Sequence, residues 1–429
     1  MAALVISAVF LFLIAIGVPI GTCLGAASVV TLFAFNLGAG MLGMNFHAGI
    51  ASFPLLAIPF FVLAGVILEK AGLAASIARF FELIVGRMVG GLAVVAVLTS
   101  MFWGAISGSG PATTAAVGLI LLAPMVRHGY DKHFAGATIA GASDLSIIIP
   151  PSIAFIIYGN ITGISVSALF VAGIIPGLIT GAGMVLMAYL ISRIRGYRGT
   201  VERGTVRDIL SALRSSIWAL LAPVVILGGI YTGIFTPTEA AVVAVFYSFF
   251  VAVFVYRSIT AADFVQILVE AAVTSSVIMY IVVFAGLFTW VASVIGVIDM
   301  AAKFIVQVSP NAVVMIVLVD VLLLMLGMVL DAISISYILM PILVPVLAAF
   351  KIDLLWYGVI FVCAMAIGQA TPPVGVNLFT AANLVRGNLD SIAKEAIPYV
   401  IISTIVLIII SIFPVLSTYL PLRAGLYGR

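Results

Sequence analysis

The chain has 429 residues, of which 65% are hydrophobic and only 8% are charged. Soluble globular proteins carry about 25% charged residues, so this composition excludes an ordinary cytosolic or secreted protein. Disordered and coiled-coil chains are rich in charge, and a net charge of +3 is far too small for a nucleic-acid-binding surface. Long apolar stretches recur along the whole chain and predict an all-α polytopic membrane protein.

Membrane spans are predicted where about 20 apolar residues lie between charged or turn-rich breaks. These spans are 3–35, 53–69, 134–160, 164–193, 216–235, 238–256, 268–295, 355–383 and 396–420. Two further apolar blocks, 88–128 and 311–350, are interrupted at the middle by polar or small residues. Each arm of these blocks has about 16–19 residues, which is short for a span. We expect both blocks to be re-entrant hairpins, although a pair of ordinary spans in each block would preserve the orientation of the rest.

The basic residues test this topology, because cytoplasmic loops carry an excess of Lys and Arg. With the N-terminus inside and both blocks re-entrant, nine full spans remain and 14 of the 18 basic residues fall inside. The inside residues are Lys70, Arg79, Arg87, Arg127, Lys132, Arg193, Arg195, Arg198, Arg203, Arg207, Arg214, Arg257, Arg386 and Lys394. The outside residues are Lys303, Lys351, Arg423 and Arg429. The first hairpin then enters from the cytoplasm and the second from the opposite face.

The two halves of the chain resemble each other when the sequence is shifted by 222 residues. The matching positions are Asp131 with Asp353, Gly136 with Gly358, Pro150-Pro151 with Pro372-Pro373, Pro176 with Pro398 and, after a slip of one residue, Gly104 with Gly327. Each half contains a hairpin, a short charged link, a helix broken by Pro-Pro and a closing span. Because the halves have opposite orientations, the sequence predicts an inverted-topology repeat, a plan that many secondary transporters share.

This repeat divides the chain into four segments. Residues 1–87 are predicted to form N-terminal scaffold spans, and residues 194–310 a cytoplasmic loop with further scaffold spans. Residues 88–193 form the first transport repeat, with hairpin 88–128 and broken helix 134–160. Residues 311–429 form the second transport repeat, with hairpin 311–350 and broken helix 355–383.

A set of short motifs occurs in a fixed order along the chain. The motifs are ISGSG at 106–110, IPPSI at 149–153, YG at 158–159, GIFTPTEAA at 233–241, GMVLD at 327–331 and TPPVGVNL at 371–378. Taken together, over essentially the whole chain, they resemble the large membrane subunit of a tripartite ATP-independent periplasmic transporter. The chain departs from the family pattern at Asp144, where a small or neutral residue is more usual, and at Ala154, where a proline is common.

The resemblance implies a sodium-driven importer of organic acids in the bacterial inner membrane, with an elevator-type transport domain and no cofactor besides the coupling ions. It also implies two protein partners, a smaller membrane subunit and a periplasmic substrate-binding protein. The substrate that it implies is an organic acid of the carboxylate or sialic acid type.

The two Pro-Pro breaks are the places where we expect coupling ions to bind. Two adjacent prolines remove backbone donors and free carbonyl groups inside a span, and oxygen atoms are the ligands that hard cations prefer. Together with the hairpin tips, the breaks predict two symmetry-related sodium sites, although Pro-Pro could also simply kink a packing helix. The candidate ligands are Ser107, Ser109, Asp144, Ser146, Ile149 and Pro151 in the first half, and Gly327, Gly368, Thr371 and Val374 in the second.

The substrate is expected between the hairpin tips. Helices that start at the tips direct their N-terminal N–H groups to the midplane, which suits a carboxylate. The candidate substrate residues are Ser109, Thr113, Thr114, Ser334 and Asn377. Small Ser and Thr residues also allow helices to pack closely in lipid, so the same residues have a structural alternative.

Acidic residues inside the apolar segments are candidates for specific roles, because burying a carboxylate in the membrane costs free energy. Asp144 is expected to be an ion-coupled or proton-coupled group, with a structural partner to a polar neighbour as the alternative. Asp331 follows the second tip and is expected to cap the next helix. Thr236 and Glu239 have the spacing of a capping box. Asp320 has no role that the sequence assigns.

Other functions fit the sequence less well. An intramembrane serine protease would need a histidine in a central span as the base for its nucleophile, and the sequence has none there. An aspartyl protease would need two facing intramembrane aspartates, and Asp144 and Asp320 lack the flanking glycine-aspartate signature. A passive channel would not need broken helices repeated in opposite orientations, and an ATP-driven pump would need a phosphate-binding loop that the sequence lacks. A sodium-coupled carboxylate transporter that acts without a binding protein remains the nearest alternative.

Overall fold

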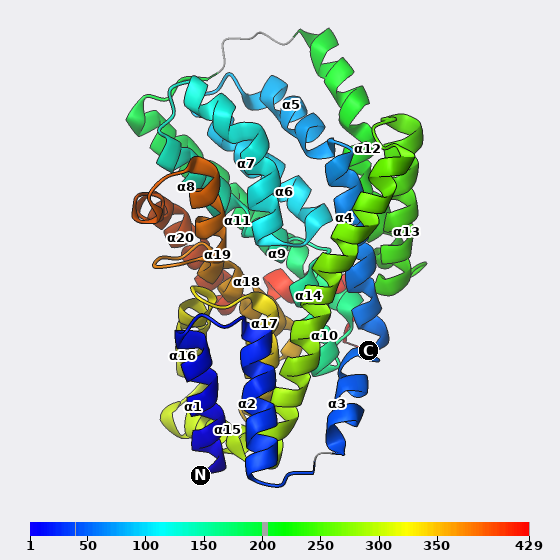
Figure 1. The fold of residues 1–429 in the computed structure, drawn as a ribbon. Helices are drawn as coiled ribbons and strands as arrows, with labels where there is room; N and C mark the ends of the chain where they lie inside the picture. The colour runs from blue at the N-terminus through cyan, green and yellow to red at the C-terminus, as the bar shows by residue number, and fades with distance from the viewer. Residues whose placement is uncertain (39, 200–204, 429) are drawn as a thin grey trace.

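The structure, a computed structural model, describes residues 1–38, 40–199 and 205–428, so Arg203 and Arg429 lie outside the described residues. The regular structure in these ranges is helical (Figure 1). In the described residues, nine helical segments are long and apolar enough to cross a membrane. The prediction of an all-α chain rich in membrane-spanning helices is therefore confirmed.

The helices follow one another along the chain with short connections. They are α1 (Ala2–Ala15), α2 (Ile20–Ala34), α3 (Met41–Ile50), α4 (Ala57–Lys70), α5 (Leu73–Val85), α6 (Gly91–Ser107), α7 (Gly110–Arg127), α8 (Lys132–Ala142), α9 (Leu145–Ile148), α10 (Ile153–Thr162), α11 (Val166–Arg195), α12 (Val206–Tyr231), α13 (Pro237–Phe250), α14 (Ala261–Val294), α15 (Val297–Val308), α16 (Ala312–Gly327), α17 (Ala332–Ala349), α18 (Leu354–Gln369), α19 (Val376–Val385), α20 (Leu389–Ile412) and α21 (Val415–Arg423). A 3-10 turn, Phe53–Leu56, precedes α4, and a π-helical turn, Val251–Val255, extends α13.

The N-terminal region differs from the single span predicted at 3–35. Two shorter helices, α1 and α2, pack side by side there in opposite directions (Figure 1). Gly17 between them has a φ of +82°, which favours glycine, and Pro19 lacks the N–H that a continuous helix would need. As a result, Met1 and the start of α3 lie at the same end of the molecule, so the predicted inside location of the N-terminus does not fit the fold.

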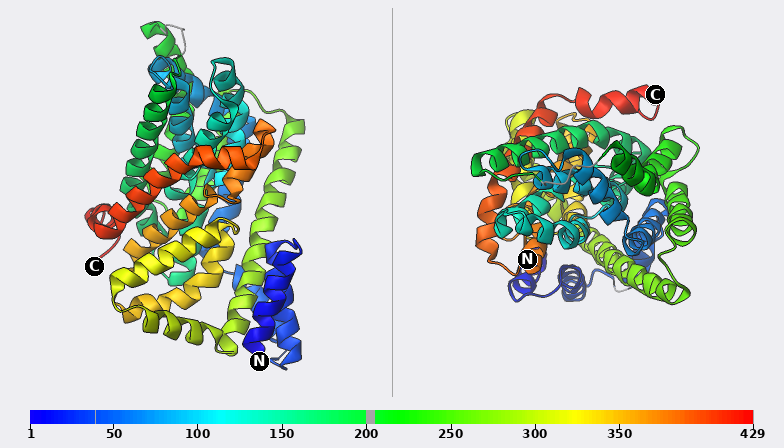
Figure 2. Two further views of the ribbon diagram at one scale, coloured as in Figure 1. Left: turned by 90° about the vertical axis from the view of Figure 1, so that its left-hand side faces the viewer. Right: turned by 90° about the horizontal axis from the view of Figure 1, so that it is seen from above.

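The remaining helices keep the predicted separation of the basic residues. Figure 1 shows the end of α7, the start of α12 and helix α5 at one end, where the loops predicted to be cytoplasmic lie. Helix α15, which carries Lys303, lies at the opposite end. The long helix α14 connects the two ends, and the side view in Figure 2 shows it along one face of the molecule.

Two helical hairpins point toward the centre from opposite ends. Helices α6 and α7 pack against each other and turn at Gly108, which has a φ of +63°. Helices α16 and α17 form the second hairpin, with its turn between Met328 and Asp331. Both turns lie near the middle of the molecule, the first hairpin descending and the second ascending in Figure 1. The two interrupted blocks of the sequence are therefore hairpins with central tips.

The two Pro-Pro segments interrupt the most deeply buried part of the chain. The first interruption separates α9 from α10, and a further break at Ser143 and Asp144 separates α8 from α9. The second separates α18 from α19 over residues 370–375. Both Pro-Pro peptide bonds are cis. Nearly every residue from 132 to 162 and along α18 is buried, so both predicted broken helices are present.

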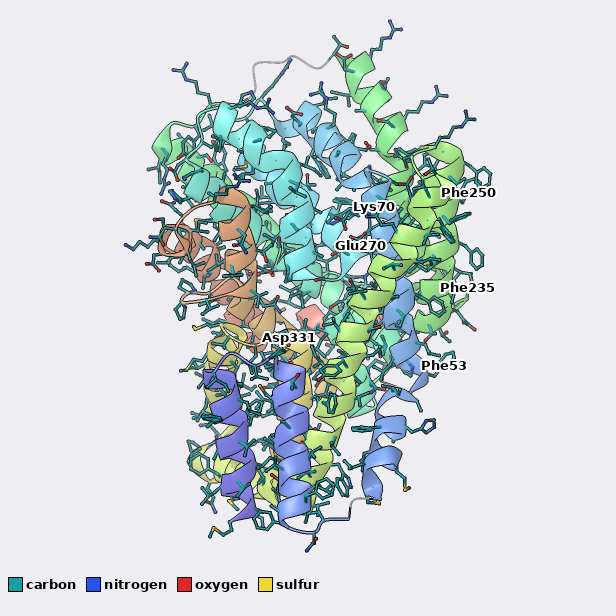
Figure 3. All side chains as sticks on the ribbon, in the orientation of Figure 1. Phe53, Lys70, Phe235, Phe250, Glu270 and Asp331 are labelled. Carbon is teal, nitrogen blue, oxygen red and sulfur yellow. The ribbon has the colours of Figure 1, made fainter. Side chains whose placement is uncertain are left out.

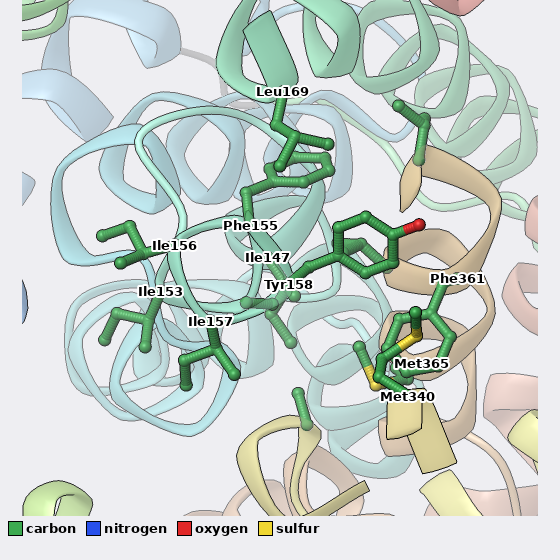
Figure 4. Packing of buried hydrophobic residues seen from close by; sticks show 14 of the residues in the cluster. Ile147, Ile153, Phe155, Ile156, Ile157, Tyr158, Leu169, Met340, Phe361 and Met365 are labelled. Carbon is green, nitrogen blue, oxygen red and sulfur yellow. The ribbon is translucent and has the colours of Figure 1, made fainter. Parts of the chain in front are cut away.

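The hydrophobic core surrounds these broken helices. Tyr158 and Phe155 from α10 pack with Leu169 from α11 and with Phe361 from α18 (Figure 4). Met340 of the second hairpin joins the same cluster. Close packing of this kind fixes the breaks in position, because buried side chains interdigitate with little free space.

Helix caps fix the ends of these elements. Asp131 and Asp353, the matching pair of the repeat, accept backbone N–H groups at the starts of α8 and α18. Asp331 caps α17 in the same way. Thr236 and Glu239 form the predicted capping box at the start of α13. The capping roles expected of Asp331 and of this pair are confirmed.

Candidate functional site

A cavity of about 500 Å³ lies where the two hairpin tips meet the scaffold helices. Ser107–Ala112 from the first tip and Asp331–Ile333 from the second line it, together with residues of α4 and α14. Gln369, at the end of α18, contributes a polar side chain to the same wall. The cavity therefore brings together the two tips, residues that flank both breaks, and helices of the predicted scaffold.

Each hairpin contacts the broken helix of its own half through a glycine. A Cβ atom at Gly104 would lie 2.5 Å from the Cα of Ser146. A Cβ atom at Gly327 would lie 2.9 Å from the Cα of Gly368. Because Gly104 matches Gly327, and Ser146 matches Gly368, the same backbone contact occurs in both halves. Small residues at such positions let two backbones approach closely.

At the first tip, hydroxyl groups and backbone atoms form a small polar network. The Oγ of Ser107 lies 3.1 Å from the Oγ1 of Thr113 and donates to the carbonyl of Ser109 at 3.2 Å. Gly108 faces the carbonyl oxygen of Pro151, which lies 3.2 Å from the point where a Cβ would stand. The first hairpin thus lies against the first broken helix at Ser146 and at Pro151.

At the second tip, the break and the hairpin are joined by a backbone hydrogen bond. The N–H of Gly375 donates to the carbonyl of Met328 at 2.9 Å. The carbonyl oxygens of Gln369 and Thr371 converge on Gly375, whose φ is +55°, within 2.7 and 3.1 Å of a Cβ position. Gly327, Gly368 and Thr371 are therefore neighbours, while the side chain of Val374 is 40% exposed and could offer only its carbonyl.

Asp144 makes a contact that crosses from one half to the other. Its carboxylate accepts a hydrogen bond of 2.9 Å from the side-chain amide of Asn377, and both side chains are buried. The carboxylate is therefore directed to the second broken helix. Although Asp144 is near Ser146 in sequence, its recorded bond is to Asn377.

The two helix N-termini at the cavity differ in one respect. The first N–H groups of α17 are occupied by the carboxylate of Asp331. Ser109 precedes α7 but makes no side-chain capping bond. Unpaired N–H groups at a helix start attract anions. The start of α7, which lines the cavity at Gly110, is thus the end that a substrate carboxylate could occupy.

Charged side chains lie at the scaffold wall of the cavity. Glu69 of α4 and Glu270 of α14 line it, and Lys70 pairs with Glu270 at 3.2 Å. Figure 3 shows Lys70 and Glu270 side by side where α4 and α14 meet. Neither Glu69 nor Glu270 could be identified from the sequence, where each is only a charge near the end of a predicted span.

The predicted substrate residues are distributed unevenly around the cavity. Ser109 lines it. Thr113 and Thr114 are buried behind the tip, and Ser334 donates to Asp331 at 2.5 Å. Asn377 reaches the cavity only through its neighbour Gly110. Gln369 was missed, although a lone amide in the otherwise apolar α18 is a signal that could have identified it.

The chain matches a known family of membrane transporters. Residues 7–416 match the family model described as the tripartite ATP-independent periplasmic transporter, DctM component. The chain is 37% identical to the C4-dicarboxylate TRAP transporter large permease protein DctM of Pseudomonas aeruginosa, with 94% of each chain covered. It is 33% identical to the sialic acid large permease SiaM of Vibrio cholerae, covering 96% of this chain and 97% of that one.

Some relatives are longer, and one solved structure shares the fold. The chain is 36% identical to the isethionate permease DctMQ of Oleidesulfovibrio alaskensis but spans only 65% of its length. The YdaH transporter of Alcanivorax borkumensis has a TM-score of 0.61 over 90% of this chain and 89% of its own, at 14% identity. These relatives are named as transporters and permeases rather than enzymes. The chain belongs to the DctM component family of tripartite ATP-independent periplasmic transporters.

Proposed function

We propose that this chain is the sodium-coupled membrane permease of an organic-acid importer in the bacterial inner membrane. The observation that carries the proposal is the central cavity, where two oppositely directed hairpin tips meet the uncapped start of α7. An uncapped helix start suits one acidic group of a substrate. The relatives named for isethionate, C4-dicarboxylate and sialic acid all concern organic anions.

Sodium binds at the two tips in this proposal. The first site draws on Ser107, Ser109, Ser146, Ile149 and Pro151. The second draws on Gly327, Gly368, Thr371 and Val374. The support is the repeated glycine contact between hairpin and break, which holds hydroxyl and carbonyl oxygens next to each tip. Unwound backbone near the midplane is where secondary transporters hold sodium.

Transport would follow an elevator cycle. The two hairpins and two broken helices, residues 88–193 and 311–429, form an inverted repeat that moves against the scaffold of residues 1–87 and 194–310. The hairpins enter the membrane without crossing it. The excess of basic residues at the α5 end supports a cytoplasmic location for that end, with the α15 end facing the periplasm.

Two partners complete the importer. A smaller membrane subunit would bind the scaffold, and a periplasmic binding protein would deliver the substrate to the α15 end. Two observations support these partners. The family belongs to a tripartite transporter, and the DctMQ relative is longer than this chain, which spans 65% of it.

Uptake by reconstituted transporter tests the proposal. Proteoliposomes holding the chain with its copurifying small subunit should accumulate a radiolabelled C4-dicarboxylate or sialic acid only with a sodium gradient and the cognate binding protein. Replacing Ser107 or Thr371 with Ala should each weaken the sodium dependence by removing a hydroxyl at one tip. Equal uptake in potassium-only buffer would refute sodium coupling, and unchanged dependence in both variants would remove the tip sites.

A second function differs only in its partners. A sodium-coupled carboxylate transporter without a binding protein would share these hairpins. The same proteoliposomes separate the two, because such a transporter would accumulate the acid when the binding protein is omitted.

A further inference from the structure

We infer that Asp144, Asn377 and Gln369 form an additional sodium site between the two halves, separate from both tip sites. The inference rests on the proposed sodium coupling and adds one ion to it. Its starting point is a group of buried oxygen atoms that lack partners. Asp144 is 1% exposed, Asn377 is fully buried and Gln369 is 4% exposed.

Asn377 donates one N–H of its amide to the carboxylate of Asp144 at 2.9 Å. This bond fixes the orientation of the amide, since the reverse orientation would set its oxygen against a carboxylate oxygen. The Oδ1 of Asn377 is consequently left without a hydrogen-bond partner in the described structure. Buried polar atoms in this condition call for a bound water or ion, because leaving them bare is costly.

The Oε1 of Gln369 is also buried without a hydrogen-bond partner among the described residues, and it lies near the same residue, Gly110. Both amide oxygens converge on Gly110, at 2.6 Å for Asn377 and 3.0 Å for Gln369 from where a Cβ would stand. Only a glycine at this position leaves room for both oxygens. Two unpaired acceptors therefore meet beside Gly110 at the start of α7, and the amide of Asn377 connects them to the carboxylate of Asp144.

The charge balance favours a cation as the occupant. None of the ion pairs recorded for the described residues includes Asp144, so an ionised Asp144 needs a cation beside it, as buried charges do. A cation coordinated by the carboxylate of Asp144 and the two amide oxygens would satisfy all three groups at once. Sodium suits this set because hard cations prefer oxygen ligands, and water can complete its coordination.

The position of the site has a functional consequence. Asp144 belongs to the first broken helix, while Gln369 and Asn377 flank the second break. Gly110, on which the two amides converge, begins the helix whose uncapped end faces the cavity. A sodium ion here would join both halves and bring positive charge close to the start of α7, which strengthens its attraction for an anionic substrate.

Equilibrium binding of ²²Na⁺ to the purified chain in detergent tests the site without a substrate. At saturation the unmodified chain should bind about three ions, and Asp144→Asn, which keeps the side-chain shape, about two. Asp320→Asn removes another buried aspartate and is the matched control, with about three ions expected. The reciprocal exchange, Asp144→Asn with Asn377→Asp, keeps one carboxylate and one amide in contact and should restore the lost ion.

The outcomes separate this site from the general proposal. Binding of about two ions by both the unmodified chain and Asp144→Asn would overturn the additional site and leave the tip sites intact. The same result is expected if Asp144 holds a proton instead of sodium, so it also overturns the inference. An equal loss of bound sodium in Asp320→Asn would overturn it too, because the loss would then not be specific to Asp144. No bound sodium at all would instead refute sodium coupling itself.

Discussion

Single glycines decide how closely the hairpins approach the broken helices. Gly104 meets the backbone of Ser146, and Gly327 meets that of Gly368, with no room for a Cβ atom. Backbone cannot move aside as the end of a flexible side chain can. The oxygen atoms of each tip site therefore depend on a residue that offers no ligand of its own.

Replacing Gly104 with Ala should separate the first hairpin from its broken helix. The added Cβ would stand 2.5 Å from the Cα of Ser146, and overpacking of this kind costs about 1–3 kcal/mol. We expect a lower thermal unfolding temperature and weaker ²²Na⁺ binding. Gly228→Ala in α12 is the matched control, because nothing lies within 4 Å of its Cβ position. Equal behaviour of the two variants would contradict the proposed role of the contact.

At the scale of elements, the two hairpins differ in how their second helices begin. Helix α17 starts at Asp331, whose carboxylate accepts from Ile333 and Ser334. Helix α7 starts at Ser109 without a side-chain cap. In the proposed function, this difference makes the start of α7, and not that of α17, the place for a substrate carboxylate.

Removal of the Asp331 cap should loosen the start of α17. Loss of an aspartate cap costs about 0.5–2 kcal/mol, so Asp331→Ala should speed amide exchange at Ile333 and Ser334, measured by hydrogen–deuterium exchange with mass spectrometry. Asp331→Asn retains an acceptor oxygen and should keep most of the protection. Unchanged exchange in the alanine variant would show that packing alone holds this turn.

At the scale of the whole molecule, polar contacts join the scaffold to the two halves of the repeat. The hydroxyl of Ser52 donates to the side-chain oxygen of Asn160 at the end of α10. The hydroxyl of Thr289 in α14 donates to the carbonyl of Tyr337 in α17 at 2.9 Å. An elevator movement would have to break both contacts.

A disulfide across one of these contacts tests the movement. Ser52→Cys combined with Asn160→Cys should cross-link on oxidation, because the two side chains touch, and uptake should stop until a reductant is added. Each single-cysteine variant under the same oxidant is the control, and the natural residues Cys23 and Cys363 are both buried. Full uptake by the cross-linked protein would argue against movement of residues 88–193 relative to residues 1–87.

The sequence by itself determined the class of the protein, its broken helices and the pairing of its two halves. Apolar length and scarce charge indicate a membrane protein, and two adjacent prolines remove two backbone donors from a span. The Pro-Pro breaks and the caps at Asp331 and Thr236 could therefore be predicted from the sequence. The single span predicted at 3–35 was wrong. Gly17 and Pro19 favour the turn between α1 and α2, and α2 packs against α14. The hydropathy of the segment does not indicate this packing.

Only the tertiary structure decided which polar groups share a site. Asp144 and Asn377 are 233 residues apart in the chain, and Gln369 and Gly110 lie in different halves. The sequence pattern assigned Asp144 to the first tip because of its neighbours in the chain. Its hydrogen bond depends instead on how the two broken helices cross, which is set by the packing of many apolar side chains at once and has no local signature.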